Sequence, residues 1–78
     1  MDNPRVVEVL EAIARLLELQ DENPFKVRAY QNAARTLEGQ TVEISELVRS
    51  GALADLPGFG EALVEKVTTL VQTGKLKY

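Results

Sequence analysis

Apolar residues recur at helical spacing in the first quarter of the chain. From residue 3 to about residue 19 they fall three, four and seven positions apart, and charged residues occupy most positions between them. Asn3 and Pro4 open this segment, as a capping residue followed by a proline whose missing amide hydrogen is not needed there. The pattern predicts one helix with a single buried face, formed by Val6, Val9, Leu10, Ile13, Leu16 and Leu17.

The remaining segments repeat this organisation. Asn23 and Pro24 give the same start signal for a helix that continues through Leu37 and stops at Gly39. Two further helices are predicted, over about 44–50 and over 61 to about 73. No segment alternates between apolar and polar residues, so the prediction is an all-α fold of four to five short helices. The buried face of the second helix is expected to hold Val27, Tyr30, Ala33, Ala34 and Leu37.

A seven-residue pattern, Leu-Val-x-(Ser/Thr)-Gly-x-Leu, occurs at residues 47–53 and again at residues 70–76. Each copy is typical of the last turn of a helix, a glycine in the left-handed conformation and a leucine that folds back onto that turn. We interpret the pattern as a repeated helix stop at Gly51 and Gly74.

Length and composition restrict the class of protein. A chain of 78 residues is expected to form a single domain, and its hydrophobic fraction of 45% is that of a globular domain without a membrane span. Cysteine and histidine are both absent, which excludes zinc sites built from these residues and Ser-His-Asp hydrolysis. The lack of cysteine and of a signal peptide indicates a cytoplasmic protein, expected to be a monomer.

The net charge of −3 conceals a segregation of charges along the chain. Residues 23–37 contain Lys26, Arg28 and Arg35 without an acid, and residues 66–78 contain Lys66, Lys75 and Lys77 without an acid. The acidic residues lie in the two other blocks. These basic segments can form one anion-binding patch if the fold brings them together, or they can be ordinary solvated faces.

The segment Pro57-Gly58-Phe59-Gly60 predicts a tight turn directly before the last helix. Amides at the start of a helix lack intrahelical acceptors and lie at the positive end of the helix dipole. The amides of Gly58, Gly60 and Glu61 therefore form a candidate phosphate site. A glycine pair at a turn is also explained by steric needs alone.

The longer string from Leu56 to Gly60, followed by Leu63, Val64, Val67 and Leu70 at core spacing, resembles the helix-hairpin-helix motif at about residues 52–73. That motif binds the DNA backbone phosphate without reading bases, and the resemblance implies that Phe59 packs inward. Residues 22–30 and 33–39, Glu-Asn-Pro-Phe-Lys-Val-Arg-Ala-Tyr and Ala-Ala-Arg-Thr-Leu-Glu-Gly, look like the amino-terminal domain of family X DNA polymerases. The resemblance thus covers nearly the whole chain and is closest to bacterial and archaeal members.

In that family the domain binds the 5′-phosphate side of a gap in DNA during repair, including base excision repair. By position, the resemblance implies that Lys26 holds the 5′-phosphate and assists the lyase site, together with Tyr30. Arg28 lies on the predicted solvent-exposed face of the same helix and is a candidate contact to the DNA backbone. The resemblance also implies a monovalent cation, Na⁺ or K⁺, on the backbone carbonyls of Ala54, Leu56 and Phe59.

Some family members also act as a 5′-deoxyribose-phosphate lyase through a Schiff base. The nucleophilic lysine of the family aligns with Lys66, which Tyr30 would assist in proton transfer. Independently, Lys66 lies about 100° from the middle of the buried stripe of its helix, with Ala62, Leu63, Thr69 and Leu70 as neighbours. Partial burial without a local carboxylate favours the neutral amine that a Schiff base requires.

The residues around the hairpin depart from the lyase pattern. Asp55, Glu61 and Ala62 stand where members with strong lyase activity have additional lysines.

The chain cannot polymerise DNA by itself, because Asp2, Asp21 and Asp55 are far apart and no Asp-x-Asp pair exists to hold two metal ions. The end of the chain just after a helix stop suggests a domain boundary, and the resemblance implies either a domain excised from a longer polymerase or a freestanding relative that lost the rest.

Three functions remain open from the sequence. The first is sequence-independent binding of gapped or nicked DNA as the N-terminal domain of a repair polymerase. The second is a Schiff-base lyase acting through Lys66. The third is an acidic helical module for protein interaction, in which the hairpin serves only packing.

Overall fold

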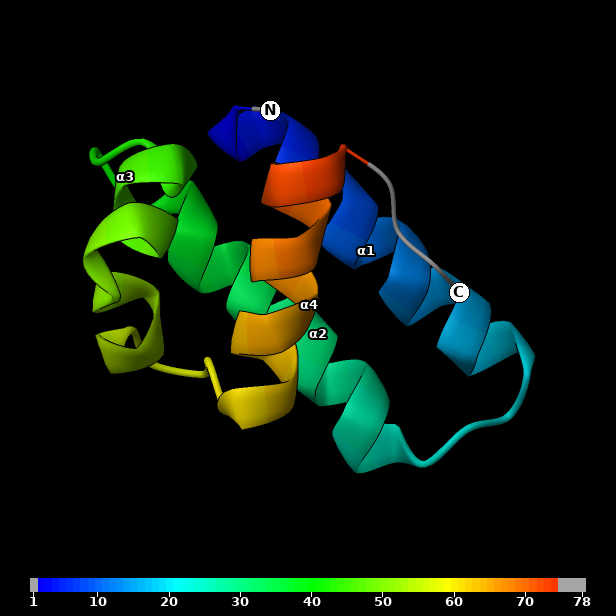
Figure 1. The fold of residues 1–78 in the computed structure, drawn as a ribbon. Helices are drawn as coiled ribbons and strands as arrows, with labels where there is room; N and C mark the ends of the chain where they lie inside the picture. Colours follow the sequence, from blue (N-terminus) through cyan, green and yellow to red (C-terminus); the bar gives the residue numbers. More distant parts are fainter. Residues whose placement is uncertain (1, 75–78) are drawn as a thin grey trace.

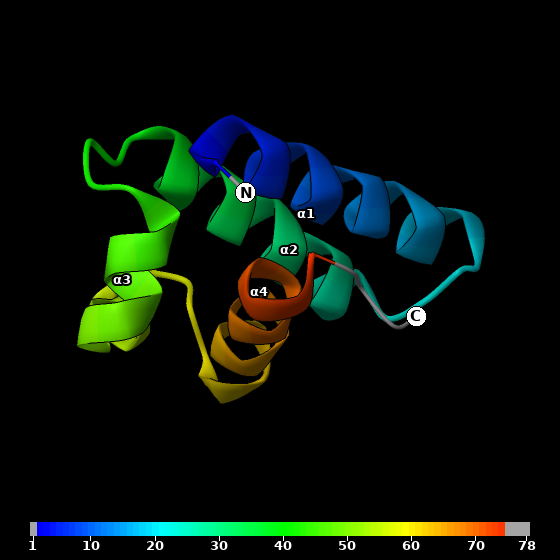
Figure 2. The same ribbon diagram turned by 45° about the horizontal axis from the view of Figure 1, so that its top comes forward.

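A computed structural model describes residues 2–74, which form an all-α fold (Figure 1). The elements are α1 (Asn3–Leu19), α2 (Pro24–Glu38), α3 (Ile44–Ser50), the short 3₁₀ helix η1 (Ala52–Asp55) and α4 (Glu61–Thr73). The antiparallel helices α1 and α2 lie side by side, and α3 and α4 pack against one face of this pair (Figures 1 and 2). The predicted helices and fold class are therefore confirmed.

The start of α1 differs from the prediction. Asp2, rather than Asn3, caps the helix, because the amide of Arg5 donates to Asp2 Oδ1 at 3.0 Å. Asn3 is the first helical residue, and its side chain instead reaches the loop before α3. There Asn3 Nδ2 donates to the carbonyl of Val42 at 2.9 Å, and Asn3 Oδ1 accepts from the amide of Ile44 at 2.6 Å. Asn3 therefore ties the start of α1 to the start of α3.

The second helix begins as predicted. Asn23 caps α2 through a bond of 2.9 Å from the amide of Phe25 to Asn23 Oδ1, and Pro24 occupies the first helical position. All of the apolar residues predicted for its inner face are buried: Val27, Tyr30, Ala33, Ala34 and Leu37.

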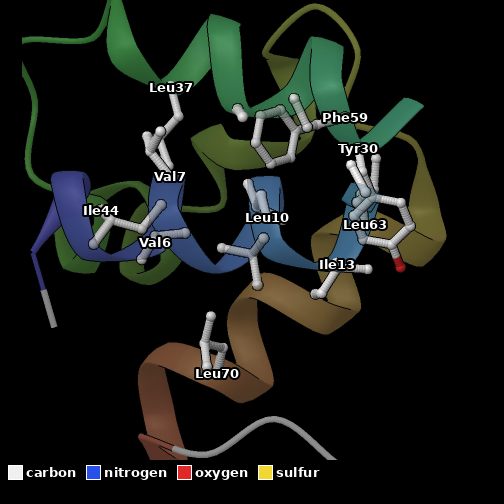
Figure 3. Close-up of a cluster of buried hydrophobic side chains, with 14 of the residues drawn as sticks. Val6, Val7, Leu10, Ile13, Tyr30, Leu37, Ile44, Phe59, Leu63 and Leu70 are labelled. Atoms are coloured by element: carbon white, nitrogen blue, oxygen red, sulfur yellow. The ribbon is translucent and has the colours of Figure 1, made fainter. Parts of the chain in front are cut away.

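The core is formed by the inner faces of α1, α2 and α4, together with buried residues of α3 and η1 (Figure 3). The inner face of α1 is rotated from the predicted one: Val7 and Ala14 are buried, Val9 is half-buried, and Leu16 is 46% exposed. The prediction of Leu16 as a core residue is wrong, because the buried face of α1 is centred on the side that carries Val7 and Ala14. From α4, the predicted residues Leu63, Val67 and Leu70 all reach the core.

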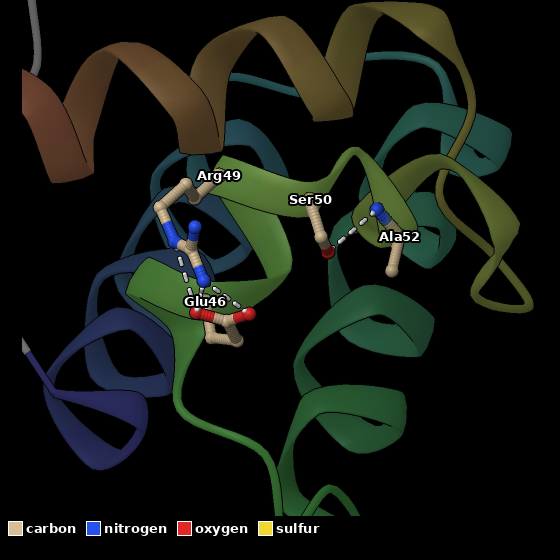
Figure 4. Close-up of polar contacts among 4 residues, drawn as sticks. All are labelled: Glu46, Arg49, Ser50 and Ala52. Carbon is tan, nitrogen blue, oxygen red and sulfur yellow. Dashed lines mark hydrogen bonds and ion pairs between the residues drawn. The ribbon is translucent and has the colours of Figure 1, made fainter.

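The repeated helix stop is confirmed at both glycines. Gly51 and Gly74 follow α3 and α4 with φ values of 78° and 69°, which is the left-handed region that favours glycine. Leu53 folds back and is 1% exposed, whereas Leu76 lies outside the described residues. At the first stop, Ser50 Oγ accepts from the amide of Ala52 at 3.3 Å (Figure 4).

Arg49 on α3 is held by an acidic neighbour. Its guanidinium bonds both carboxylate oxygens of Glu46, with distances of 2.6–3.0 Å (Figure 4). This pair lies on the surface of α3, away from the turn before α4. Within the part of the chain that the structure describes, no helix has the length and apolar character needed to cross a membrane.

Candidate nucleic-acid interface

The segment between η1 and α4 forms a tight turn. The amide of Phe59 donates to the carbonyl of Leu56 at 3.2 Å, which closes a β-turn with Pro57 and Gly58 at its centre. Gly58 has φ of +85°, so this is a type II turn, in which the third residue requires a positive φ. Proline fixes the second position and glycine permits the third, as the sequence predicted.

The turn leads directly into the start of α4. Gly60 is extended, with φ of −79° and ψ of 174°, and its carbonyl accepts the first intrahelical bond, from the amide of Val64 at 3.0 Å. No side chain caps this helix. Among residues 2–74, the amides of Gly58, Gly60 and Glu61 donate to no protein acceptor. The structure thus places three unsatisfied amides at the positive end of the dipole of α4.

Helix α2 contacts the turn through a hydrogen bond and through van der Waals packing. Thr36 Oγ1 donates to the carbonyl of Pro57 at 2.9 Å. Gly58 lies beside α2, since a Cβ placed on it would be in ordinary van der Waals contact with Cβ of Asn32, at 3.7 Å. Phe59 points into the core and is 6% exposed, as predicted (Figure 3). The sequence did not reveal Thr36 or Asn32 as part of this region, because both contacts join residues far apart in the chain.

Lys66 and Tyr30, the two candidate catalytic residues, come together across α4 and α2. Lys66 is half-buried, and its Nζ lies 5.8 Å from the centroid of the Tyr30 ring, within the range of a cation–π interaction. The Tyr30 ring is 5% exposed, and its hydroxyl lies at the edge of the hydrophobic cluster (Figure 3). Tyr30 is therefore a core residue whose ring lies within reach of the Lys66 amine.

The two candidate cations of α2 occupy different surroundings. Lys26 is exposed in the first turn of α2, one turn before Tyr30 and on the same side of the helix. Arg28 is exposed about 200° further round the helix from Tyr30. It lines a hollow between the end of α1 and the start of α2, together with the acidic residues Glu18, Asp21 and Glu22. Lys26 thus lies on the side of α2 that carries Tyr30, whereas Arg28 lies on another face.

The described parts of the two basic segments meet at this place. Lys66 belongs to the second segment and contacts Tyr30 in the first, whereas Lys75 and Lys77 lie outside the described residues. Acidic side chains flank the turn on both sides, since Asp55 ends η1 and Glu61 begins α4, and both are exposed. Two exposed carboxylates therefore flank the turn that carries the free amides.

The carbonyls predicted to hold a cation lie along the same turn. The Leu56 carbonyl accepts the turn hydrogen bond and keeps one lone pair, and among the described residues no amide donates to those of Ala54 and Phe59. Carbonyl oxygens of this kind suit Na⁺ or K⁺. Within residues 2–74 no group of acidic side chains is arranged to hold a metal ion.

Two helical elements joined by a glycine-containing hairpin, with free amides at the start of the second helix, define a helix-hairpin-helix domain. The helix-hairpin-helix domain family matches residues 1–76 of the chain, so the chain belongs to this family.

A comparison with characterised proteins agrees with this assignment. The chain is 32% identical over 75 residues to DNA polymerase/3′-5′ exonuclease PolX of Bacillus subtilis, and the match covers 96% of the chain. The chain spans 13% of the length of that relative. The resemblance to a domain of family X DNA polymerases is thus confirmed.

Proposed function

We propose that this helix-hairpin-helix domain binds DNA through backbone phosphate, without reading bases, and that it contacts the 5′-phosphate side of a gap or nick. The observation that carries the proposal is the set of three amides, of Gly58, Gly60 and Glu61, which have no protein acceptor among the described residues and lie at the positive end of α4. A relative of this chain is a DNA polymerase, which supports DNA as the partner.

The residues around the turn have complementary tasks in this proposal. A phosphate oxygen accepts hydrogen bonds from the hairpin amides, and the ammonium groups of Lys26 and Lys66 supply positive charge beside it. Na⁺ or K⁺ on the carbonyls of Ala54, Leu56 and Phe59 would add charge at the turn. Arg28, which lies on another face, would contact the backbone further along the duplex.

The context of this binding is also part of the proposal. The domain would serve as the N-terminal part of a longer DNA repair polymerase and bring it to gaps. This agrees with the 13% of the relative that the chain spans. Because few phosphates are contacted, affinity should fall with a shallow slope as salt rises, by about 0.9 log units per contacted phosphate for each tenfold increase.

The test is binding to a duplex with a one-nucleotide gap, with and without a 5′-phosphate in the gap, measured by fluorescence anisotropy at low and moderate salt. We expect the phosphate to tighten binding, and Lys66→Ala to weaken the phosphorylated complex about three- to tenfold by removing one nearby charge. Arg49→Ala is the matched control, because it removes one cation from α3, which lies outside the proposed phosphate site.

Absence of binding to either duplex at low salt would contradict the proposal. The hairpin would then serve only to pack α4 on α2, and the domain would be an acidic module for protein interaction. Equal weakening by Lys66→Ala and Arg49→Ala would show that only the total charge matters.

A second candidate function, the 5′-deoxyribose-phosphate lyase, is favoured by the contact between Lys66 and Tyr30. In this reaction the Lys66 amine adds to the C1′ aldehyde of the opened sugar and water leaves, which gives a Schiff base. Loss of a C2′ proton then breaks the C3′–O bond and releases the DNA strand with a 5′-phosphate at its end. Water finally hydrolyses the Schiff base and frees the lysine from the remaining sugar phosphate. The Tyr30 hydroxyl, at the edge of the cluster, would assist proton transfer.

Borohydride trapping on a pre-incised abasic duplex tests the lyase, since only a Schiff base is reduced to a covalent adduct. We expect an adduct with the unmodified protein and none with Lys66→Arg, which keeps the positive charge for DNA binding but lacks a primary amine. An adduct that persists in Lys66→Arg would assign the reaction to another amine, and its absence in the unmodified protein would exclude the lyase while leaving the binding proposal intact.

A further inference from the structure

The peptide bond between Pro57 and Gly58 can have two orientations in a turn of this sequence. Types I and II differ mainly by a half-turn of this central peptide, which reverses the sign of φ at the third residue. Proline at the second position is compatible with both types, and glycine tolerates both signs of φ. Glycine at the third position after proline favours type II, in agreement with the observed φ of +85° at Gly58, and a contact from elsewhere in the fold can strengthen this preference.

A side chain of α2 supplies such a contact. Thr36 Oγ1 donates to the carbonyl oxygen of Pro57 at 2.9 Å, across 21 positions of sequence. In a trans peptide the carbonyl and the following N–H point in opposite directions, and the described residues contain no cis peptide. Because the Pro57 carbonyl points toward α2, the Gly58 N–H points away from α2.

Reversal of this peptide would have two consequences. The Thr36 hydroxyl would lose the Pro57 carbonyl as its acceptor. The Gly58 N–H would also turn toward α2, where Asn32 and Ala33 lie beside the turn. The amide would then no longer point away from α2.

We infer that Thr36 is a positioning residue for the phosphate site: its hydroxyl fixes the Pro57–Gly58 peptide so that the Gly58 N–H is presented to a DNA phosphate. This inference rests on the proposed function. The same hydrogen bond polarises the peptide, since a carbonyl that accepts a bond makes its own N–H a stronger donor. Thr36 thus acts on the phosphate through Gly58 and without contact to DNA.

The experiment compares Thr36→Val with the unmodified protein. Valine keeps the shape of threonine and removes the donor, whereas Thr36→Ser keeps the donor and should restore the behaviour of the original residue. Thr68→Val is the matched control, because Thr68 is also half-buried within a helix and its hydroxyl makes no hydrogen bond within residues 2–74.

Two quantities are measured for each variant. The first is the nuclear Overhauser effect between the Gly58 amide proton and Hα of Pro57, which is strong in a type II turn and weak in type I. The second is the ratio of dissociation constants for gapped DNA without and with the 5′-phosphate. We expect Thr36→Val to weaken the Overhauser effect and to reduce this ratio about two- to fivefold, which is the loss of up to one ordinary hydrogen bond.

The outcomes separate this inference from the proposed function. Failure of the unmodified protein to bind DNA would overturn the proposed function, and with it the role of Thr36 toward phosphate, while the Overhauser effect would still report whether Thr36 holds the peptide. If the unmodified protein binds, but Thr36→Val keeps both the Overhauser effect and the ratio, the inference is overturned. An equal loss in Thr68→Val would also overturn it, since a general loss of stability would then explain both.

Discussion

Replacement of Phe59 by alanine is expected to destabilise the domain by about 3–5 kcal/mol, the usual cost of removing a buried phenylalanine ring. Phe59 is 6% exposed and packs in the core between α2 and α4 (Figure 3). A domain of 78 residues is typically stable by about 4–12 kcal/mol, so this one change removes a large part of the total. Denaturant unfolding followed by circular dichroism at 222 nm measures the difference.

The chain offers a matched control for this experiment. Phe25 is 76% exposed at the start of α2, so Phe25→Ala removes the same ring from a position where little is buried. We expect Phe25→Ala to change stability by no more than about 0.5 kcal/mol. Similar losses in the two variants would contradict the packing described for the hairpin, because they would show that Phe59 contributes no more burial than a surface residue.

Replacement of Glu61 by lysine is expected to strengthen DNA binding about tenfold at low salt. Glu61 is the first residue of α4, so its carboxylate lies beside the amides proposed to hold a phosphate. Reversal of its charge exchanges repulsion for attraction at short range, and the gain should shrink as salt screens it. The same change should lower stability by up to about 1 kcal/mol, because a cation at a helix N-terminus opposes the dipole.

Glu61→Lys is thus expected to raise DNA affinity and to lower the stability of the domain. Glu65→Lys is the control, since Glu65 is exposed on the same helix but one turn beyond the free amides. It makes the same change in net charge, and we expect it to alter affinity by much less. Equal gains from both variants in anisotropy titrations would mean that DNA responds to overall charge, and a gain from neither would argue against a phosphate at the start of α4.

Local signals in the sequence predicted the helices well. Pro24 lies at a helix start, and Gly51 and Gly74 mark helix stops, because capping and left-handed glycine depend on a few neighbouring residues. The turn at residues 57–60 was predicted for the same reason. Leu16 shows the limit of this reasoning, since helical spacing defines a broad apolar stripe, whereas the packing of α2 on α1 decides which edge of it is buried.

Contacts between distant residues carry the information that the sequence pattern lacked. Asn3 is of a residue type that often caps helices, yet its side chain bonds the loop before α3. Asp2 already accepts the hydrogen bond from the Arg5 amide. Thr36 has no feature that sets it apart within α2 until the fold brings Pro57 to it. The pairing of Lys66 with Tyr30 was anticipated from the family resemblance, because periodicity places each residue on its own helix and cannot bring the two helices together.

The long-range bonds of Asn3 bear on the order in which the chain folds. Most helix contacts in this protein join neighbours in sequence, such as α1 with α2, and such contacts form early because little chain entropy is lost in closing them. The bond between Asn3 and Ile44 spans 41 positions and requires α1, α2 and the following loop to be in place. We therefore expect the bonds of Asn3 to form late in folding, after α1 and α2 have paired.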